Sequence, residues 1–279
     1  MSRFAKTYSA YSQVAASEMQ PFGFDLTSVS RLEPVLAFLF QDWWKVNFMG
    51  LDLLPSSGPA LIVGNTGGVL PWTALMLLYV LMSRKDKPRQ LSILAELSWI
   101  DDERLYRELM EIGFVPWSSD NAKQLFASGH LVAVFPEGIA GLCKPYPERN
   151  RLRSFDWTKL LPAIECNVPI FPLATLGCDE SVPVVSNLSG IARILHWPSY
   201  PITPFFPWLP FPANLLSLPV KWQMRLLKPC KYQVEGCRDD LENTARQLAL
   251  FLEGEVQAEL NRLLRARMKA SIAGSVTHL

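Results

Sequence analysis

Residues 60–82, with the sequence ALIVGNTGGVLPWTALMLLYVLM, decide the fold class of this chain. The opening run ALIVG is short, apolar and contains β-branched residues, which is typical of a buried strand. The pair Gly67–Gly68 predicts a tight loop, and Pro71 with Thr73 predicts the start of a helix that runs to the end of the stretch. This helix is apolar on all sides, so we expect it to be buried in protein or pressed against lipid. A strand, a short loop and a helix in this order form one unit of an α/β fold.

The same alternation continues on both sides of this unit. Strands are predicted at residues 91–96, 113–117, 131–135 and 168–177, with helices at 101–111, 119–126 and 158–165. Upstream, an apolar helix that starts at Pro34 is predicted to lead into a short strand closed by Gly50, and residues 231–236 are predicted to form the last strand. This pattern predicts a single α/β domain with a mainly parallel central sheet flanked by helices.

The patterning divides the chain into three parts. Residues 1–33 form a polar, poorly patterned N-terminal segment, residues 34–238 form the α/β domain, and residues 239–279 form a C-terminal amphipathic helix and tail. The apolar side chains of this helix recur at three- and four-residue steps and therefore share one face: Leu241, Ala245, Leu248, Leu252, Val256, Leu260 and Leu263.

The composition narrows the class of function. Hydrophobic residues make up 49% of the 279 residues and charged residues 19%, so the chain is apolar for a globular protein but not outside the range. A formal charge of +1 gives no bulk attraction to nucleic acid. The five cysteines show no CxxC spacing and no histidine in ligand spacing, so we expect reduced thiols in a cytoplasmic protein and no metal site. The N-terminal residues lack an apolar core, which predicts that no signal peptide is present.

The longest uncharged run, from Ile194 to Val220, contains seven prolines. Each proline removes a backbone donor, so this apolar run cannot form a lipid-exposed spanning helix and is predicted to be a loop. Its aromatic side chains suit the membrane interface, and we expect Trp197, Phe205, Phe206, Trp208 and Phe211 to contact the bilayer. A lid over the core or over an acyl-chain groove is the alternative. Peripheral binding to the inner face of the membrane is therefore expected.

Two sequence blocks carry a resemblance to a known family. The first is Asn65-Thr66-Gly67-Gly68-Val69-Leu70-Pro71-Trp72-Thr73 followed by an apolar helix, and the second is Phe135-Pro136-Glu137-Gly138 after an apolar strand. In order along the chain, both blocks resemble motifs of the glycerol-phosphate and lysophospholipid acyltransferase family. The segments VPIFPLATLG and LPVKWQMRLLKP extend the resemblance, which covers residues 34 to 268.

The resemblance implies a reaction and its participants. The family transfers an acyl group from acyl-CoA or acyl carrier protein to a lipid hydroxyl, with no bound cofactor, as a step of phospholipid synthesis. It implies that the substrate is bound by a set of residues from both blocks and the loop after them: Asn65, Gly67, Gly68, Glu137, Gly138, Lys144, Arg149 and Arg151. Glu137 either binds a polar head group or only fixes its own loop. The three basic residues either hold a phosphate or form a solvated loop.

This chain departs from the family where the chemistry takes place. Thr66 stands at the position of the family's catalytic histidine, and Thr73 at the position of its aspartate. The histidine removes the proton of the attacking hydroxyl, and the aspartate orients the imidazole. A threonine hydroxyl has no accessible pKa for either task. No arginine lies between Phe114 and Ala122, where many members hold the substrate phosphate. Thr73 is instead expected to cap its helix.

The chain contains three histidines, and none is a convincing replacement. His130 is predicted to be a surface turn residue, His196 lies in the proline-rich run, and His278 lies near the C-terminus. We therefore expect a membrane-surface protein that binds an acyl-chain or lysolipid ligand, with catalysis lost or impaired. Two alternatives stay open: an active acyltransferase with an unusual base, and a regulatory or scaffold partner of an active homologue.

Overall fold

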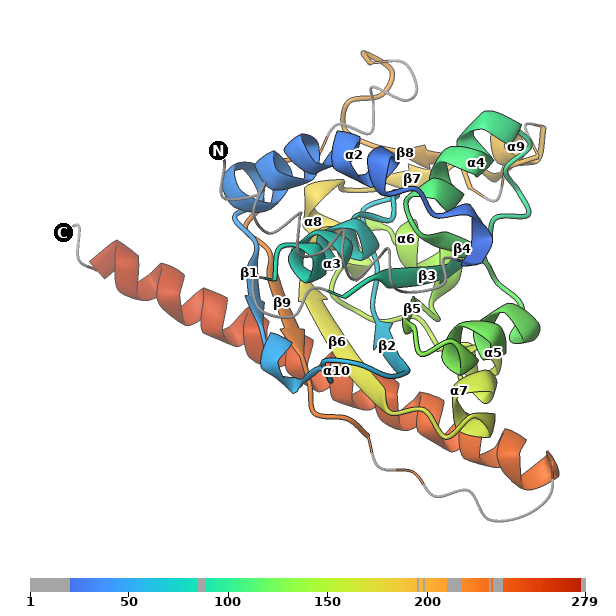
Figure 1. Cartoon of the computed structure of the whole chain (residues 1–279). Coiled ribbons are helices and arrows are strands. Elements are labelled where there is room, and N and C mark those ends of the chain that lie inside the picture. The colour runs from blue at the N-terminus through green and yellow to red at the C-terminus, as the bar shows by residue number, and fades with distance from the viewer. Residues whose placement is uncertain are drawn as a thin grey trace.

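The computed structural model describes residues 21–84, 89–194, 196–197, 199–209, 217–230, 232 and 238–276. Within these residues, a seven-stranded sheet with the order β1-β9-β6-β2-β5-β3-β4 forms the centre of the molecule (Figure 1). Its strands are β1 (Asn47–Met49), β2 (Ala60–Gly64), β3 (Leu91–Ala95), β4 (Phe114–Pro116), β5 (Leu131–Val134), β6 (Ile170–Leu176) and β9 (Gln223–Leu226). Neighbouring strands are parallel except for β6 and β9, which are antiparallel. The predicted α/β class and mainly parallel sheet are confirmed.

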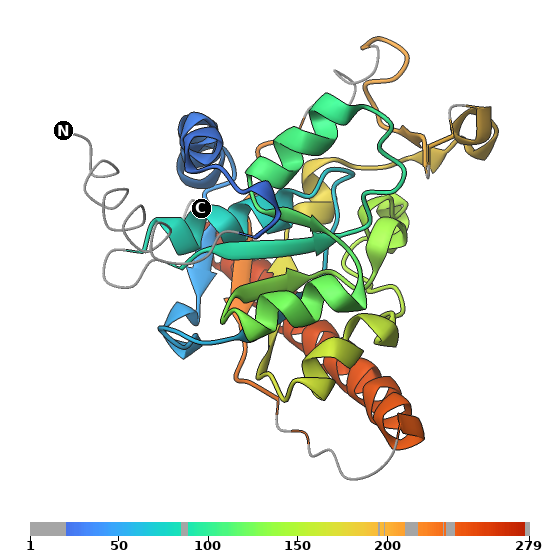
Figure 2. The same cartoon turned by 45° about the vertical axis from the view of Figure 1, so that its right-hand side comes forward.

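Helices cover both faces of this sheet. Successive side chains of a strand point to opposite sides, and both sides of the central strands are apolar, so both faces must be covered. In β2, Ile62 belongs to one apolar cluster and Leu61 and Val63 belong to the other. The first cluster is covered by α2 (Leu26–Phe38), α3 (Trp72–Met82) and α4 (Glu103–Glu111), and the second by α5 (Ser119–Ala127), α7 (Leu161–Glu165) and α10 (Arg238–Val276). Figure 2 shows α2 and α10 on opposite sides of the sheet.

The N-terminal helix differs from the prediction. Helix α2 begins at Leu26 rather than at Pro34, because Asp25 accepts hydrogen bonds from the backbone N–H groups of Thr27 (3.0 Å) and Ser28 (3.1 Å) and caps it. The helix continues through Pro34 and then widens to a π-helix, η2 (Leu39–Trp43), before β1. The aspartate cap in the sequence was the signal for this earlier start.

The C-terminal part confirms one prediction and shifts another. Helix α10 is present, and six of the seven predicted apolar side chains are buried: Ala245, Leu248, Leu252, Val256, Leu260 and Leu263. The strand predicted at residues 231–236 falls largely outside the described residues. Within this range the structure describes only Tyr232, which lies in no strand. The last described strand is β9, which pairs with both β1 and β6.

Short elements connect the longer helices and strands. They are η1 (Pro21–Gly23), η3 (Leu51–Leu53), α6 (Gly138–Leu142), η4 (Tyr146–Glu148), η5 (Trp157–Lys159), α8 (Cys178–Ser181) and α9 (Ser189–Ile194). Strands β7 (Ser186–Asn187) and β8 (Pro201–Ile202) form a small antiparallel pair. Residues 203–209, which follow β8, project above α2 and α4 in both views (Figures 1 and 2). Among the described helices, none is both long and apolar enough to span a membrane.

Candidate active site

Three loops meet at the carboxyl ends of β2, β5 and β6, the edge at which open parallel sheets bind ligands. The loop after β2 contains Asn65 to Pro71, the loop after β5 contains Glu137 at the start of α6, and the loop after β6 contains Gly177 and α8. Because β2 lies between β5 and β6, its loop contacts the other two. Both blocks that carry the family resemblance therefore lie in one place.

Glu137 is the centre of this contact. Its Oε1 accepts a hydrogen bond from the backbone N–H of Thr66 at 3.1 Å, and its Oε2 accepts one from the backbone N–H of Arg153 at 2.7 Å. The ammonium of Lys144 lies 3.3 Å from the same Oε2. Glu137 therefore joins the loop after β2 to the chain that follows α6. Gly141 makes this approach possible, because a Cβ there would lie 2.5 Å from the Cβ of Glu137.

Lys144 binds a second carboxylate as well. Its Nζ lies 3.3 Å from Oδ2 of Asp179, which also accepts a hydrogen bond from the backbone N–H of Asn150 at 2.8 Å. All three charged side chains are buried. Burial raises the pKa of Glu137 and of Asp179, against the opposing effect of Lys144. Burial alone would lower the pKa of Lys144, but the two carboxylates outweigh it and raise that pKa. The cluster Glu137–Lys144–Asp179 is thus a satisfied buried ion network.

The glycine pair of the loop after β2 is explained by Asp179 and its neighbour. A Cβ on Gly67 would lie 1.8 Å from Oδ1 of Asp179, and one on Gly68 would lie 2.7 Å from the carbonyl oxygen of Cys178. Gly68 also has a φ of 83°, a conformation that favours glycine. Both glycines are therefore required by the close approach of the loop after β6.

Asn65 holds the start of the same loop against β6. Its Nδ2 donates to the carbonyl oxygen of Thr175 at 2.9 Å, and its Oδ1 accepts from the N–H of Thr175 at 2.7 Å. These two bonds replace the strand pairing that ends at Gly64 and Leu173. The amide of Asn65 is therefore engaged with backbone, which is a positioning role.

Thr66 and Thr73 lie in different surroundings. Thr66 is buried but lines an apolar cavity, whereas Thr73 is fully buried and its hydroxyl has no hydrogen-bond partner among the described residues. The expected capping role of Thr73 is wrong. Helix α3 begins at Trp72 with Pro71 at its N-cap, so Thr73 already lies within the first turn.

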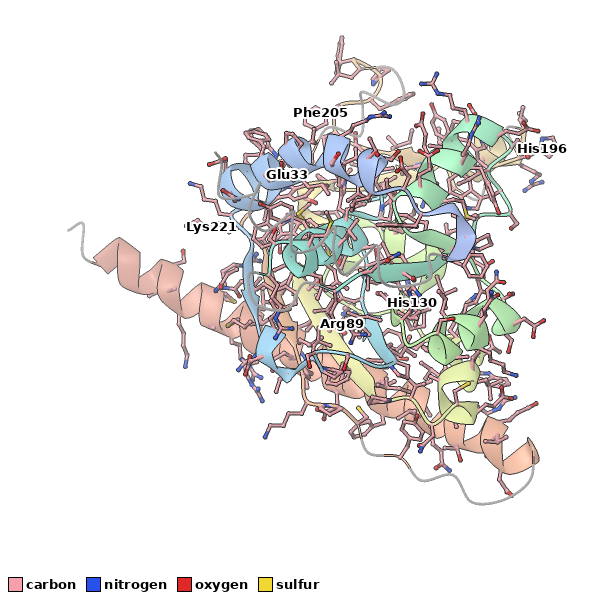
Figure 3. The ribbon with its side chains drawn as sticks, viewed as in Figure 1. Glu33, Arg89, His130, His196, Phe205 and Lys221 are labelled. Carbon is pink, nitrogen blue, oxygen red and sulfur yellow. The ribbon has the colours of Figure 1, made fainter. Side chains whose placement is uncertain are left out.

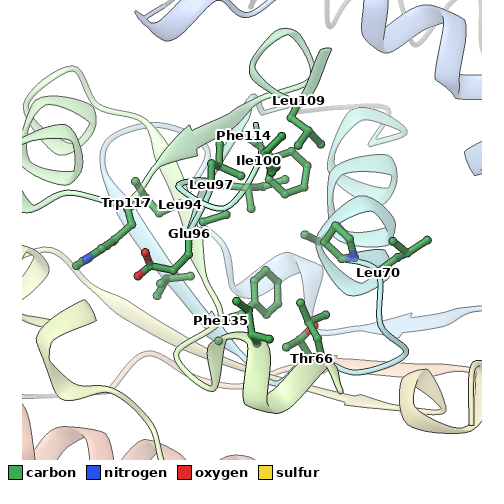
Figure 4. Close-up of a pocket in the computed structure, with 18 of the residues that line it drawn as sticks. Thr66, Leu70, Leu94, Glu96, Leu97, Ile100, Leu109, Phe114, Trp117 and Phe135 are labelled. Atoms are coloured by element: carbon green, nitrogen blue, oxygen red, sulfur yellow. The ribbon is translucent and has the colours of Figure 1, made fainter. Parts of the chain in front are cut away.

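The cavity next to Thr66 has a volume of about 240 Å³ (Figure 4). Its walls come from the loops after β2, β3 and β5, together with α4 and α6. The lining is almost entirely apolar and includes Leu70, Leu97, Ile100, Leu109, Phe114 and Phe135. Among the described lining residues, only Glu96 and Lys159 are charged. Such a wall suits a hydrocarbon chain rather than a polar metabolite.

Two proteins with similar sequences show the family to which this chain belongs. The uncharacterized protein Rv0502 of Mycobacterium tuberculosis is 33% identical to the chain over 249 residues, which cover 88% of this chain and 69% of that protein. The uncharacterized protein ML2427 of Mycobacterium leprae is 32% identical over 250 residues, with 88% and 68% covered. The chain belongs to the family of these mycobacterial proteins. No protein-family model matches the chain.

A solved structure has the same fold as this chain. The 1-acyl-sn-glycerophosphate (LPA) acyltransferase PlsC from Thermotoga maritima superposes with a TM-score of 0.53 over 85% of this chain and 78% of that chain. The sequence identity is 15%, so the likeness concerns the fold alone. The acyltransferase fold predicted from the two sequence blocks is confirmed.

The other predicted binding residues divide into two groups. Gly138 lines the cavity, and Lys144 joins the buried ion network. Arg149 and Arg151 lie on the exposed chain that follows, where the guanidinium of Arg149 packs 4.3 Å from the ring centre of Tyr146. Asp179 is the site residue that the sequence interpretation missed. Its position directly after the strand predicted at 168–177 was a usable signal, because the carboxyl ends of parallel strands share one edge.

The two described histidines lie away from Thr66. His130 is buried rather than at the surface, because it directly precedes β5 and its backbone N–H bonds to Leu125. The four residues of β5 separate it from the carboxyl end of that strand by about 13 Å. His196 is exposed, at the outer edge near α9 (Figure 3), and His278 lies outside the described residues. Among the described residues, no group of three or more His, Cys, Asp or Glu side chains is arranged to hold a metal ion.

The predicted membrane-contact residues differ in exposure. The side chain of Trp208 is 85% exposed and that of Phe206 is 37% exposed, whereas Phe205 and Trp197 are half-buried. Trp197 stacks on Tyr200 with ring centres 6.1 Å apart. Phe211 lies outside the described residues.

Proposed function

We propose that this protein binds an acyl-chain or lysolipid ligand at the cytoplasmic membrane surface and that its acyl-transfer activity is lost or sharply reduced. The observation that carries the proposal is the apolar cavity beside Thr66. The cavity provides space for an acyl chain, but the threonine at residue 66 has no group that accepts a proton at neutral pH.

The size and lining of the cavity support a chain-like ligand. An apolar cavity of about 150 Å³ stays free of water and binds small hydrocarbons. The cavity here, at about 240 Å³, is larger and is lined by leucine, isoleucine and phenylalanine side chains. Burial of apolar surface provides about 25 cal/mol per Å², so an acyl chain is a ligand that this lining would bind well.

The replacement of both catalytic positions supports reduced transfer. Loss of a general base lowers rates by about 10²- to 10⁴-fold. Glu137 and Asp179 do not supply a substitute, because both carboxylates are buried and bonded to Lys144 and to backbone N–H groups. Acyl-CoA or acyl carrier protein remains the expected donor for whatever transfer persists.

Mass spectrometry of lipids that co-purify with the protein tests the ligand. Ile139 lines the cavity from α6, whereas its neighbour Ala140 is exposed and does not. Ile139→Trp fills the cavity and should abolish co-purification of an acyl-chain lipid, and Ala140→Trp should leave it unchanged. Equal lipid content in the two variants would overturn the proposed binding site.

Enzyme assays test the second half of the proposal. With acyl-CoA and lysophosphatidic acid, turnover should be at least ~10²-fold below that of an intact acyltransferase and insensitive to Thr66→Ala. Robust turnover that survives this change would show that a base lies elsewhere, and the protein would then be an active transferase.

The exposed aromatic residues support the membrane part of the proposal. Interfacial aromatic rings bind through apolar insertion, which salt does not screen, whereas attraction of basic residues weakens beyond a Debye length of ~10 Å. Flotation with liposomes should persist in high salt and fall when Phe205, Phe206 and Trp208 are changed to serine. Phe251→Ser provides the control, because Phe251 is 54% exposed on α10, across the sheet. Unchanged flotation of the folded triple variant would identify the segment as an internal lid.

A further inference from the structure

One end of the apolar cavity carries a charge pair that the site around Thr66 does not use. The ammonium of Lys159, at the end of η5, forms an ion pair with Glu96, which follows β3. The same ammonium lies 4.2 Å from the ring centre of Trp117. All three residues line the cavity, and Figure 4 shows Trp117 and Glu96 on one side of it, away from Leu70.

The two partners are unequally exposed. The side chain of Lys159 is 11% exposed, whereas that of Glu96 is 47% exposed. A largely buried ammonium needs an anionic or polar partner, because burial of an unpaired charge is costly. A half-exposed carboxylate, in contrast, returns to water at little cost. Lys159 therefore needs an anion, but this anion need not be Glu96.

The charge of the surroundings favours an anionic head group at this end of the cavity. Among the described lining residues, Lys159 carries the only positive charge. Near Thr66, the cluster of Glu137, Lys144 and Asp179 contains two carboxylates and one ammonium, which disfavours a further anion. The hydrocarbon part of a ligand is matched by the apolar wall between the two ends.

We propose that the cavity binds an unesterified fatty acid, with its carboxylate on Lys159 in place of Glu96. The exchange conserves charge, because one monoanion replaces another at a single ammonium. A phosphate monoester carries a larger negative charge at neutral pH and has no second cation among the described lining residues. The inference rests on the proposed chain-binding function and adds the chemical class of the head group.

A matched pair of ligands, decanoate and decanol, tests the inference on the delipidated 279-residue chain by calorimetry. The parent protein should bind decanoate about tenfold more tightly than decanol, the scale of one charge-assisted hydrogen bond. Lys159→Met should remove this preference while decanol still binds, and Lys159→Arg should keep it. Glu96→Gln should strengthen decanoate binding, because the competing anion is gone. Lys123→Met, at the surface pair with Glu165, is the control and should change neither affinity.

The outcomes separate this inference from the proposed function. Equal affinities for acid and alcohol, or a preference that persists in Lys159→Met, would overturn the head-group assignment and leave chain binding intact. If neither ligand binds the folded parent protein, the cavity does not hold acyl chains and both proposals are wrong.

Discussion

The loops after β2 and β5 lie side by side, yet they differ in what they keep of the acyltransferase pattern. The loop after β5 keeps its glutamate, and Glu137 is bonded to Thr66, Lys144 and Arg153. The loop after β2 keeps Asn65 and the glycine Gly67, which form its frame, but carries Thr66 and Thr73, which the sequence resemblance aligns with the family's histidine and aspartate.

The difference separates residues that support the fold from residues that serve only the chemistry. A buried carboxylate such as Glu137 cannot be removed cheaply, because Lys144 would lose one of its two carboxylate partners and the backbone N–H groups of Thr66 and Arg153 would lose their acceptor. An exchange of the side chain at residue 66 breaks none of these bonds, because Glu137 accepts from the backbone N–H of that residue. The retained half of the site is thus explained by stability, and its retention is not evidence of turnover.

Among the variants proposed here, one that introduces histidine and aspartate into the loop after β2 should have the largest effect, an increase in the rate of acyl transfer. Thr66→His combined with Thr73→Asp should raise acyl transfer from acyl-CoA to lysophosphatidic acid by ~10²–10⁴-fold, because a general base and its orienting carboxylate return. Thr66→His alone is the control and should gain less. A double variant that is folded, binds lipid and gains nothing would mean that the acceptor site has also been lost, and the two loops would no longer differ only in the acid–base pair.

Lys144→Met tests the stability contribution of the buried cluster Glu137–Lys144–Asp179. Removal of the ammonium that lies between Glu137 and Asp179 should lower the free energy of unfolding by about 3–5 kcal/mol at pH 7. Burial already raises the pKa of both carboxyls, and loss of the lysine raises them further. A carboxyl with a raised folded-state pKa binds its proton more tightly in the folded state. The free energy of unfolding therefore falls as pH rises from the unfolded-state pKa of the carboxyl to its folded-state pKa.

The deficit of Lys144→Met against the parent should therefore be smaller at pH 5 than at pH 7, as measured by urea unfolding. Lys123→Met, at an exposed ion pair with Glu165, should cost about 0–1 kcal/mol. A deficit for Lys144→Met that is as small as this control would show that the cluster does not hold the loop after β5 in place.

Much of this arrangement was predictable from sequence, because it depends on local patterns. The apolar run 60–64, the glycine pair and the helix after them fixed one βα unit, and the alternation of such units predicted a parallel sheet. In contrast, the positions of Asp179 and His130 depend on which strands are neighbours. Strand β6 pairs with β2 although residues 65–169 separate them, and no local pattern contains that information.

The cavity was the least predictable feature. Its walls combine the loops after β2, β3 and β5 with α4 and α6, and its volume is the space that these side chains leave unfilled. The pairing of Lys159 with Glu96 likewise joins two residues 63 positions apart. Periodicity predicts which face of an element is apolar, but it does not predict the space left between several elements.

Gly67→Ala tests whether the frame of the loop after β2 depends on Asp179. The added methyl group would lie 1.8 Å from Oδ1 of Asp179, so the carboxylate must leave Lys144 and the N–H of Asn150. We expect a loss of about 1–3 kcal/mol in unfolding free energy. Gly254→Ala is the control, because a Cβ there meets nothing within 4 Å and the residue lies in α10, where alanine stabilises a helix by up to about 1 kcal/mol. A neutral Gly67→Ala would mean that Asp179 is free to move.

The smallest effect is expected at Thr73, the buried residue that the sequence resemblance aligns with the family's aspartate. Thr73 is fully buried and its hydroxyl has no partner among the described residues, so it bears a desolvation cost without a compensating bond. Thr73→Val keeps the shape and removes this cost, and it should leave stability unchanged or raise it by about 1 kcal/mol. Ser181→Ala is the matched control, because the Ser181 hydroxyl is also buried but donates to the carbonyl oxygen of Cys178 at 2.7 Å, and its loss should cost about 1 kcal/mol. Thermal unfolding distinguishes the two signs. If Thr73→Val destabilises as much as Ser181→Ala, the hydroxyl at residue 73 has a partner in solution, and the position retains a polar function that the threonine still serves.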